Sequence, residues 1–223
     1  MPITVTLSAA AVAAVAGWFA AGWQHLLYRQ QEYRSAPATG RTLLVLRLFL
    51  GVGGAVVVGL ALRPDHYDAG PAILTAFFGA VLLILSSTDF ERRIIPNSLS
   101  YPAIILAVAF CWAWPERGVQ DVVWGAAFAI GVAVGMFALG LAFGAALGAR
   151  ATPFGLGDVK LIVLMGLLLG WPATMNALLI GVVTAGVPAL VLMLRGQGRG
   201  VFSYGPYLAL GGAAALLWPE RFT

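Results

Sequence analysis

Two aspartates stand apart from the other acidic residues of this sequence. Asp89 comes at the end of one long hydrophobic run, and Asp158 comes at the start of another, directly after Gly155-Leu156-Gly157. Two carboxyl groups a few ångströms apart do not both ionise readily near neutral pH, so they share one proton. The ionised carboxylate can then take a proton from water while the protonated one polarises a carbonyl. If the fold unites Asp89 with Asp158, the pair is able to hydrolyse an amide bond without a metal ion or a cofactor.

The spacing of these two residues does not by itself prove that they meet. Asp158 could serve only as a helix cap, and Asp89 could simply end a helix. The remaining acidic residues are expected outside, in loops or at the tail, except Glu32 and Glu91, which are expected inside and solvated. The whole set is Glu32, Asp65, Asp68, Glu91, Glu116, Asp121 and Glu220.

The composition decides what kind of molecule must position the pair. Of 223 residues, 61% are hydrophobic and only 10% are charged, and the mean hydropathy is +0.91. Soluble domains contain about 45–50% apolar and about 25% charged residues, so a soluble fold, a disordered chain and a collagen are excluded. We therefore predict an all-α polytopic membrane protein in which residues 1–223 form a single integral membrane domain.

Hydrophobic segments separated by charged or Pro/Gly-rich breaks predict about eight transmembrane helices. The segments are 3–27, 42–62, 71–88, 98–114, 122–147, 159–171, 174–194 and 205–218. With the N-terminus outside, ten Lys and Arg residues fall on the inner side and only Arg63, Arg117 and Arg221 on the outer side. Because basic loops stay in the cytoplasm, both termini are predicted outside and both aspartates at the cytoplasmic margin.

The net charge of +4 is therefore interpreted as a mark of topology. It predicts contact with membrane lipid and no nucleic-acid partner. Glycines of the fifth segment are interpreted as a stripe that lets helices pack closely. They are Gly131, Gly135, Gly140, Gly144 and Gly148.

Other groups that could carry chemistry lack partners in the sequence. The single Cys111 cannot build a disulfide or a thiolate cluster, and His25 and His66 have no second histidine nearby. No cofactor and no metal site is therefore predicted. A serine nucleophile would need an adjacent base, and none is evident. The serines considered are Ser86, Ser87 and Ser203.

Three segments, in this order, resemble the bacterial type IV prepilin peptidases. They are Asp89 with 92–97 (Arg-Arg-Ile-Ile-Pro-Asn), Gly-x-Gly-Asp ending at Asp158 and followed by Lys160, and 204–212 (Tyr-Gly-Pro-Tyr-Leu-Ala-Leu-Gly-Gly). Members of that family are polytopic aspartic proteases that cut the leader from pilin and pseudopilin precursors at the inner membrane face. The resemblance runs from about residue 71 to the end, so 71–223 is the expected peptidase core.

The resemblance implies roles for individual residues. Asp89 and Asp158 would be the catalytic pair, and Gly155 and Gly157 would let the chain approach the scissile backbone. The other residues that it suggests shape the site or bind substrate. They are Pro96 and Asn97 in the loop after Asp89, Lys160 if its side chain turns toward the pair, and Tyr204, Gly205, Pro206 and Tyr207, which either line a substrate groove or form a plain turn.

The resemblance also implies the substrate, a precursor with a basic cytosolic leader and a hydrophobic helix in the bilayer. Many relatives carry two Cys-x-x-Cys pairs between their first two spans, linked to methylation of the product. Residues 28–41 contain no Cys, so methyltransferase activity is not implied here.

The direction of the helices suggests a division of labour within the pair. Asp89 would lie near the negative carboxyl end of its helix and Asp158 near the positive amino end of its own, each effect being worth about 0.3–1 kcal/mol. This places the proton on Asp89, the acid, and the charge on Asp158, the base.

Two other functional classes remain open from the residues alone. An ion- or proton-coupled transporter would use intramembrane aspartates. That class predicts carboxylates near mid-membrane and repeated halves, and this sequence shows neither feature. A non-catalytic assembly protein of a pilus or secretion system would need only helix packing and would survive loss of Asp89 and Asp158.

Overall fold

The computed structural model describes residues 1–31, 37–64, 66–147, 155–195 and 203–222. Within these ranges the chain forms eight α-helices and two 3-10 helices, and it forms no strand, so the all-α prediction is confirmed. The elements are α1 (Ile3–Trp23), η1 (Gln24–Gln31), α2 (Gly40–Ala61), α3 (Ala69–Arg92), α4 (Asn97–Phe110), α5 (Val119–Leu147), α6 (Leu156–Leu169), α7 (Ala173–Leu194), α8 (Gly205–Leu217) and η2 (Pro219–Arg221).

The helices fall into two length classes. Across the described residues, five helical segments are long and apolar enough to cross a bilayer, in α1, α2, α3, α5 and α7. Helices α4, α6 and α8 have 14, 14 and 13 residues. At about 1.5 Å per residue they span about 20 Å, less than the hydrocarbon core of about 30 Å. The chain is thus a polytopic membrane protein, whereas the count of eight complete spans stays a prediction.

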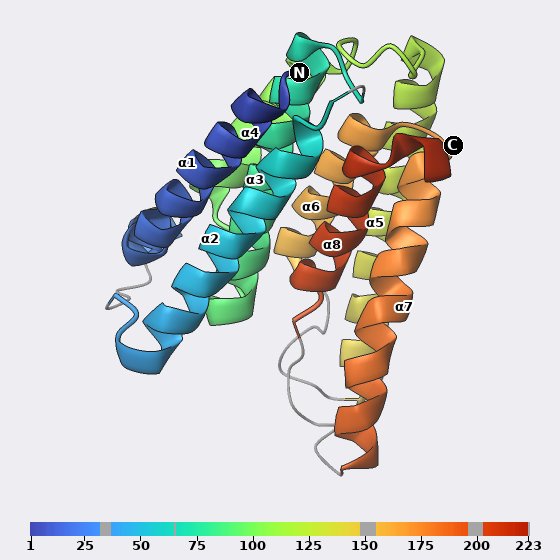
Figure 1. Cartoon of the computed structure of the whole chain (residues 1–223). Coiled ribbons are helices and arrows are strands. Elements are labelled where there is room, and N and C mark those ends of the chain that lie inside the picture. The colour runs from blue at the N-terminus through green and yellow to red at the C-terminus, as the bar shows by residue number, and fades with distance from the viewer. Residues whose placement is uncertain (32–36, 65, 148–154, 196–202, 223) are drawn as a thin grey trace.

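Successive α-helices run in alternating directions along the bundle (Figure 1). The chain ends lie at the same end of the bundle, because Met1 and Glu220 line one pocket there. This agrees with termini on a common side, while the side itself stays a prediction from the basic residues. Some charged residues of the predicted loops lie outside the described residues. They are Glu32, Arg34, Asp65, Arg150 and Arg199.

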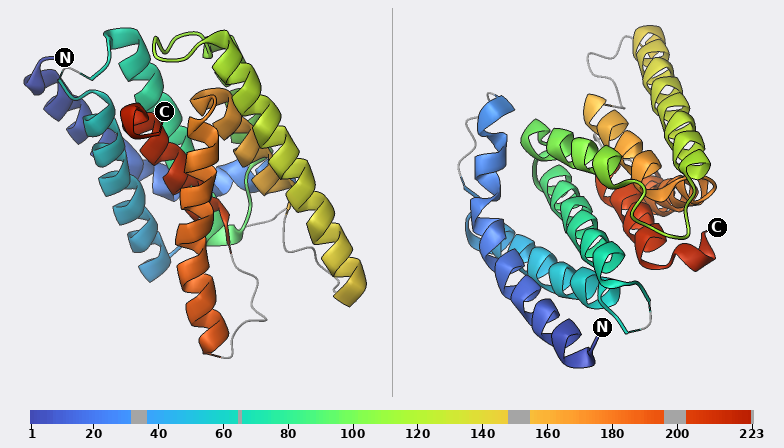
Figure 2. Two further views of the ribbon diagram at one scale, coloured as in Figure 1. Left: turned by 90° about the vertical axis from the view of Figure 1, so that its right-hand side faces the viewer. Right: turned by 90° about the horizontal axis from the view of Figure 1, so that it is seen from above.

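The short helix α6 is deeply buried in the bundle. Leu161, Leu164, Met165 and Leu168 on α6 are at most 1% exposed. Helices α6 and α8 lie among the longer helices when the bundle is viewed from above (Figure 2). Their amino ends begin higher than the lower ends of α5 and α7 in two perpendicular views (Figures 1 and 2). The centre of the bundle is therefore shorter than its flanks on the side where α3 ends.

The glycine stripe predicted on α5 does not pack as expected. A Cβ added at Gly131 or Gly135 would meet no atom within 4 Å, so the packing interpretation is wrong for both. The close approach lies one to three turns earlier, where Gly125 faces α6. A Cβ at Gly125 would come within 2.9 Å of the Gly166 carbonyl oxygen. The spacing of the glycines predicted a face of small residues on α5, but it did not predict at which turn of α5 the helix α6 makes contact. Gly148 lies outside the described residues.

Candidate active site

Asp89 lies in the last turn of α3 and is only 6% exposed. The helix ends there because Arg93 adopts a left-handed conformation, with φ of 58°, and its N–H donates to the Asp89 carbonyl oxygen over 2.8 Å. This C-cap is a common way to terminate a helix, although glycine usually occupies the position. The carboxyl group is thus held at the helix end, in the interior of the bundle.

The Asp89 carboxylate is bound by the residues that begin α8. Its Oδ2 accepts a hydrogen bond from the Gly205 N–H over 3.1 Å and another from the Ser203 hydroxyl. A Cβ on Gly205 would lie 2.5 Å from that oxygen and 2.8 Å from Cγ of Asp89, so only glycine permits this approach. Sequence reasoning considered Ser203 only as a nucleophile and missed this contact. Its place just before a predicted helix, directly before the third of the recognised segments, was the available signal.

Asp158 is the third residue of α6. Its Oδ2 accepts a hydrogen bond from the Gly155 N–H over 3.2 Å, so the capping role left open by the sequence is observed. The side chain is partly exposed, unlike that of Asp89. The negative charge of Asp89 acts on the Asp158 carboxyl group, so the two carboxyl groups lie within electrostatic range. They come from helices whose positions in the sequence are far apart.

Lys160 joins α6 to the connection between α3 and α4. Its ammonium donates to Oδ1 of Asn97 and, over 3.4 Å, to the Ile95 carbonyl oxygen. It also lies 5.2 Å from the centre of the Tyr101 ring, within range of a cation–π contact. Lys160 therefore fixes the start of α6 against the loop that follows Asp89.

The same loop contacts the glycines of the Gly-x-Gly-Asp segment. A Cβ on Gly157 would lie 3.2 Å from Cβ of Ile95, so this glycine allows close packing against the loop. A Cβ on Gly155 would meet only atoms 3.8 Å or more away, which leaves room beside it. Pro96 is buried and precedes α4, where its carbonyl oxygen accepts the N–H of Ser100 over 3.0 Å. Pro96 thus helps to fix the turn into α4.

The segment that begins α8 forms both a turn and part of a groove. The Tyr204 carbonyl oxygen accepts the N–H groups of Tyr207 and Leu208, each over 3.1 Å, and the Tyr204 ring is 38% exposed. Pro206 and Tyr207 line an apolar groove of about 510 Å³ between α2, α3 and α8. Phe90, the neighbour of Asp89, lines it as well.

Glu91 was predicted to be solvated, and this is wrong. Its side chain is 6% exposed and accepts a hydrogen bond from Gln24 over 2.8 Å. Gln24, in η1 and 3% exposed, also accepts one from Ser87 over 2.8 Å. The prediction failed because a charge just past a hydrophobic run was assumed to face water. Instead η1 covers it, so Gln24 connects two turns of α3 on either side of Asp89.

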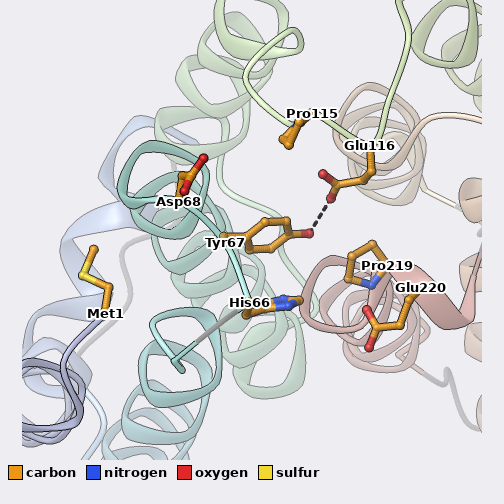
Figure 3. A pocket seen from close by; sticks show the side chains of 8 residues that line it. All are labelled: Met1, His66, Tyr67, Asp68, Pro115, Glu116, Pro219 and Glu220. Carbon is orange, nitrogen blue, oxygen red and sulfur yellow. Dashed lines mark hydrogen bonds between the residues drawn. The ribbon is translucent and has the colours of Figure 1, made fainter.

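A polar pocket lies at the end of α3 opposite to Asp89. It measures about 700 Å³ and is lined by Met1, His66, Tyr67, Asp68, Pro115, Glu116, Pro219 and Glu220 (Figure 3). The Tyr67 hydroxyl donates to Glu116 over 2.7 Å (Figure 3), and burial together with this bond raises the pKa of Tyr67. Among the described residues, no three His, Cys, Asp or Glu side chains gather as a metal ion would require. This pocket joins the α2–α3 and α4–α5 connections to the two ends of the chain.

The chain is thus a helical membrane protein with two carboxyl groups near one end of its bundle. The model of the type IV leader peptidase family matches residues 76–190, which is half of the chain. The chain therefore belongs to the type IV leader peptidase family. The matched stretch contains Asp89 and Asp158 and ends before Ser203.

Curated relatives carry the name prepilin leader peptidase/N-methyltransferase. The chain is 29% identical to the protein of Stutzerimonas stutzeri, with 64% of this chain and 48% of that protein aligned. It is 32% identical to the protein of Burkholderia pseudomallei strain 1026b, covering 76% and 53% of the two chains. For Aeromonas salmonicida strain A449 the identity is 29%, covering 76% and 56%. The chain spans about half the length of these relatives, and no solved structure matches it.

Proposed function

We propose that this chain is a membrane aspartic endopeptidase that removes the leader peptide from type IV prepilins or pseudopilins. One observation carries the proposal: Asp89 on α3 and Asp158 on α6 lie within electrostatic range of each other, in a chain of the type IV leader peptidase family. A pair of carboxyl groups that shares one proton suits hydrolysis of an amide by water. The proposal needs no metal ion or cofactor.

The proposed reaction adds one water molecule to one peptide bond. The ionised carboxylate takes a proton from water as the water oxygen bonds to the scissile carbonyl carbon, while the protonated carboxyl group gives its proton to the carbonyl oxygen. When the tetrahedral intermediate collapses, the C–N bond breaks and the amine nitrogen receives a proton from one carboxyl group. A hydroxyl of the intermediate returns its proton to the other carboxylate as the new carboxyl group of the product forms. One proton is left between Asp89 and Asp158, so the pair is ready for another cycle.

The surroundings of the pair favour a peptide substrate that enters from the basic side of the membrane. The space beside Gly155 would admit an extended backbone, and a small residue before the scissile bond, such as Gly, would fit there. The excess of inner Lys and Arg residues directs this end of the bundle to the cytoplasm of a bacterial inner membrane. A hydrophilic basic leader would remain in the cytosol while the following hydrophobic helix stays in the bilayer. Methyl transfer is not part of the proposal.

Purified protein incubated with a matched prepilin tests the proposal. We expect cleavage by the natural sequence, and a loss of at least a thousandfold in Asp89→Asn and Asp158→Asn, because each removes a group that transfers a proton. Asp68→Asn is the matched control, since Asp68 is exposed at the other end of α3 and its side chain makes no capping hydrogen bond. Intact precursor with the folded natural sequence and a cognate substrate would instead favour a transporter or an assembly protein.

A further inference from the structure

The two oxygens of the Asp89 carboxylate have different environments. Oδ2 accepts hydrogen bonds from the Ser203 hydroxyl and from the Gly205 N–H. In the part of the chain that the structure describes, Oδ1 has no hydrogen-bond donor. One oxygen is therefore held by protein, and the other is left for a water molecule or a substrate.

We propose that Ser203 and the amino end of α8 keep Asp89 as the ionised member of the acidic pair, with Oδ1 facing the reacting water. This rests on the proposed peptidase function and assigns its proton: Asp89 acts as the base and Asp158 as the acid. Ser203 and Gly205 act through Asp89 and are positioning residues. The family match ends before both of them. Ser203 is assigned from its contacts alone, whereas Gly205 also belongs to the segment 204–212 on which the family resemblance rests.

Hydrogen-bond donors decide which carboxyl group carries the charge. A hydroxyl or amide that donates to a carboxylate stabilises the ionised form over the protonated form. Asp89 receives two such donors from outside its own helix, whereas the capping bond of Asp158 comes from Gly155 of its own helix. Burial of Asp89 disfavours its charge, and these two donors together with the positive charge of Arg93 oppose that effect. Because the pair repels a second negative charge, the shared proton goes to Asp158.

This reverses the division of labour inferred from the sequence. That inference counted the negative end of α3 at Asp89 and the positive end of α6 at Asp158. The structure adds the positive amino end of α8, whose first N–H group, that of Gly205, donates to Asp89. The direction of a single helix is therefore a poor guide here, since two helix ends converge on one carboxylate.

Gly205 makes this arrangement possible. Its amide reaches Asp89 only because no side chain intervenes: a Cβ would lie 2.5 Å from Oδ2 and 2.8 Å from Cγ. Neither partner can move away easily, because the amide belongs to the first turn of α8 and Asp89 is buried. The position of α8 and the orientation of Asp89 are thus linked.

The first test compares Ser203→Ala with Ser203→Thr in prepilin cleavage by the full chain. Ser203→Ala should lower kcat about ten- to a hundredfold, as expected for losing one hydrogen bond to a charged group, while KM changes less than twofold. The acidic limb of its pH–rate profile should move to higher pH. Ser203→Thr keeps a hydroxyl and should restore both properties. Equal kcat and equal pH profiles for Ser203→Ala and the natural sequence would overturn the proposal.

The second test uses the glycine. Gly205→Ala should abolish cleavage, and Gly135→Ala should cleave normally because its added Cβ would meet no atom within 4 Å. Circular dichroism and thermal unfolding establish that both variants are folded. Should Gly205→Ala fail to fold, Ser203→Ala and Ser203→Thr carry the test. A folded Gly205→Ala with normal cleavage would contradict the assignment.

A third measurement determines which of the two carboxyl groups is protonated, and it does not depend on cleavage of a substrate. A water-soluble carbodiimide modifies protonated carboxyl groups, and mass spectrometry locates the modified aspartate. As the pH falls, Asp158 should react before Asp89, and Ser203→Ala should raise the pH at which Asp89 reacts. Earlier reaction of Asp89 would refute the proton assignment. If the natural sequence leaves every precursor intact, the proposed peptidase function fails, while this labelling still decides the state of Asp89.

Discussion

The Lys160 ammonium on α6 donates a hydrogen bond to the side chain of Asn97, the first residue of α4. Asp158 lies two residues before Lys160, and the loop before Asn97 begins at the end of the helix that carries Asp89. This one contact therefore connects the two segments from which the acidic pair comes. It also explains why a lysine near two carboxyl groups does not bind them: its charge is already used to hold α6 in place.

Breaking the Lys160–Asn97 contact should reduce both stability and activity. Lys160→Met and Asn97→Ala should each lower the free energy of unfolding by about 1.5 kcal/mol, the lower range for a hydrogen bond to a charged group. Thermal unfolding in detergent and prepilin cleavage measure the two effects. The double variant should be no worse than the more damaging single one, because both remove the same bond. Fully additive losses would mean that the residues act separately.

Gln24 should matter for the end of α3 although it lies in another element. Gln24→Leu leaves the buried groups of Ser87 and Glu91 without its hydrogen bonds, which should cost about 1–3 kcal/mol and reduce cleavage by disturbing the last turn of α3. Gln120→Leu, at an exposed position of α5, serves as the control. Thermal unfolding and kcat are the readouts. Equal stability in the two variants would show that Gln24 does not support α3.

The pocket that contains His66 should make stability depend on pH. Burial and the adjacent Arg63 lower the pKa of His66 below its ordinary value of about 6.5. Below pH 6.5 the unfolded chain therefore takes up a proton that the folded chain resists, so this contribution to stability is present above that pH and is lost as the pH falls. His66→Gln should unfold at a temperature that depends less on pH between 7.5 and 5.5. Parallel curves for the two proteins would contradict this.

Glycine substitutions should distinguish the packed contact between α5 and α6 from the open face of α5. Gly166→Ala places a Cβ 2.8 Å from the Gly125 carbonyl oxygen, so we expect a loss of about 1–3 kcal/mol by overpacking. Gly131→Ala meets open space and should stabilise the helix by up to about 1 kcal/mol, because alanine is the better helix former. Chemical or thermal unfolding compares the two. A similar loss in both would mean that the α5–α6 contact is not tightly packed.

The course of the helices was predictable because it depends on local composition. The predicted segment 205–218, for example, corresponds to α8 at Gly205–Leu217, since hydrophobic runs and their breaks are visible in the sequence. The partners of Asp89 were not predictable in the same way. Ser203 and Gly205 reach it only through the packing of α8 against α3, and no local pattern encodes that register. The prediction that Glu91 is solvated failed for the same reason, because the residues that bury its side chain belong to η1.

The shortness of α6 and α8 determines how far a substrate must travel. Both end next to a tryptophan on the side of the termini, Trp171 and Trp218, residues that favour the membrane interface. If both helices are level with the outer interface there, they end about 10 Å short of the other surface of the hydrocarbon core, which is about 30 Å thick. The two carboxyl groups then lie at that depth. A scissile bond would then descend only a third of the hydrocarbon thickness, and the strongly charged leader need not be pulled across the bilayer.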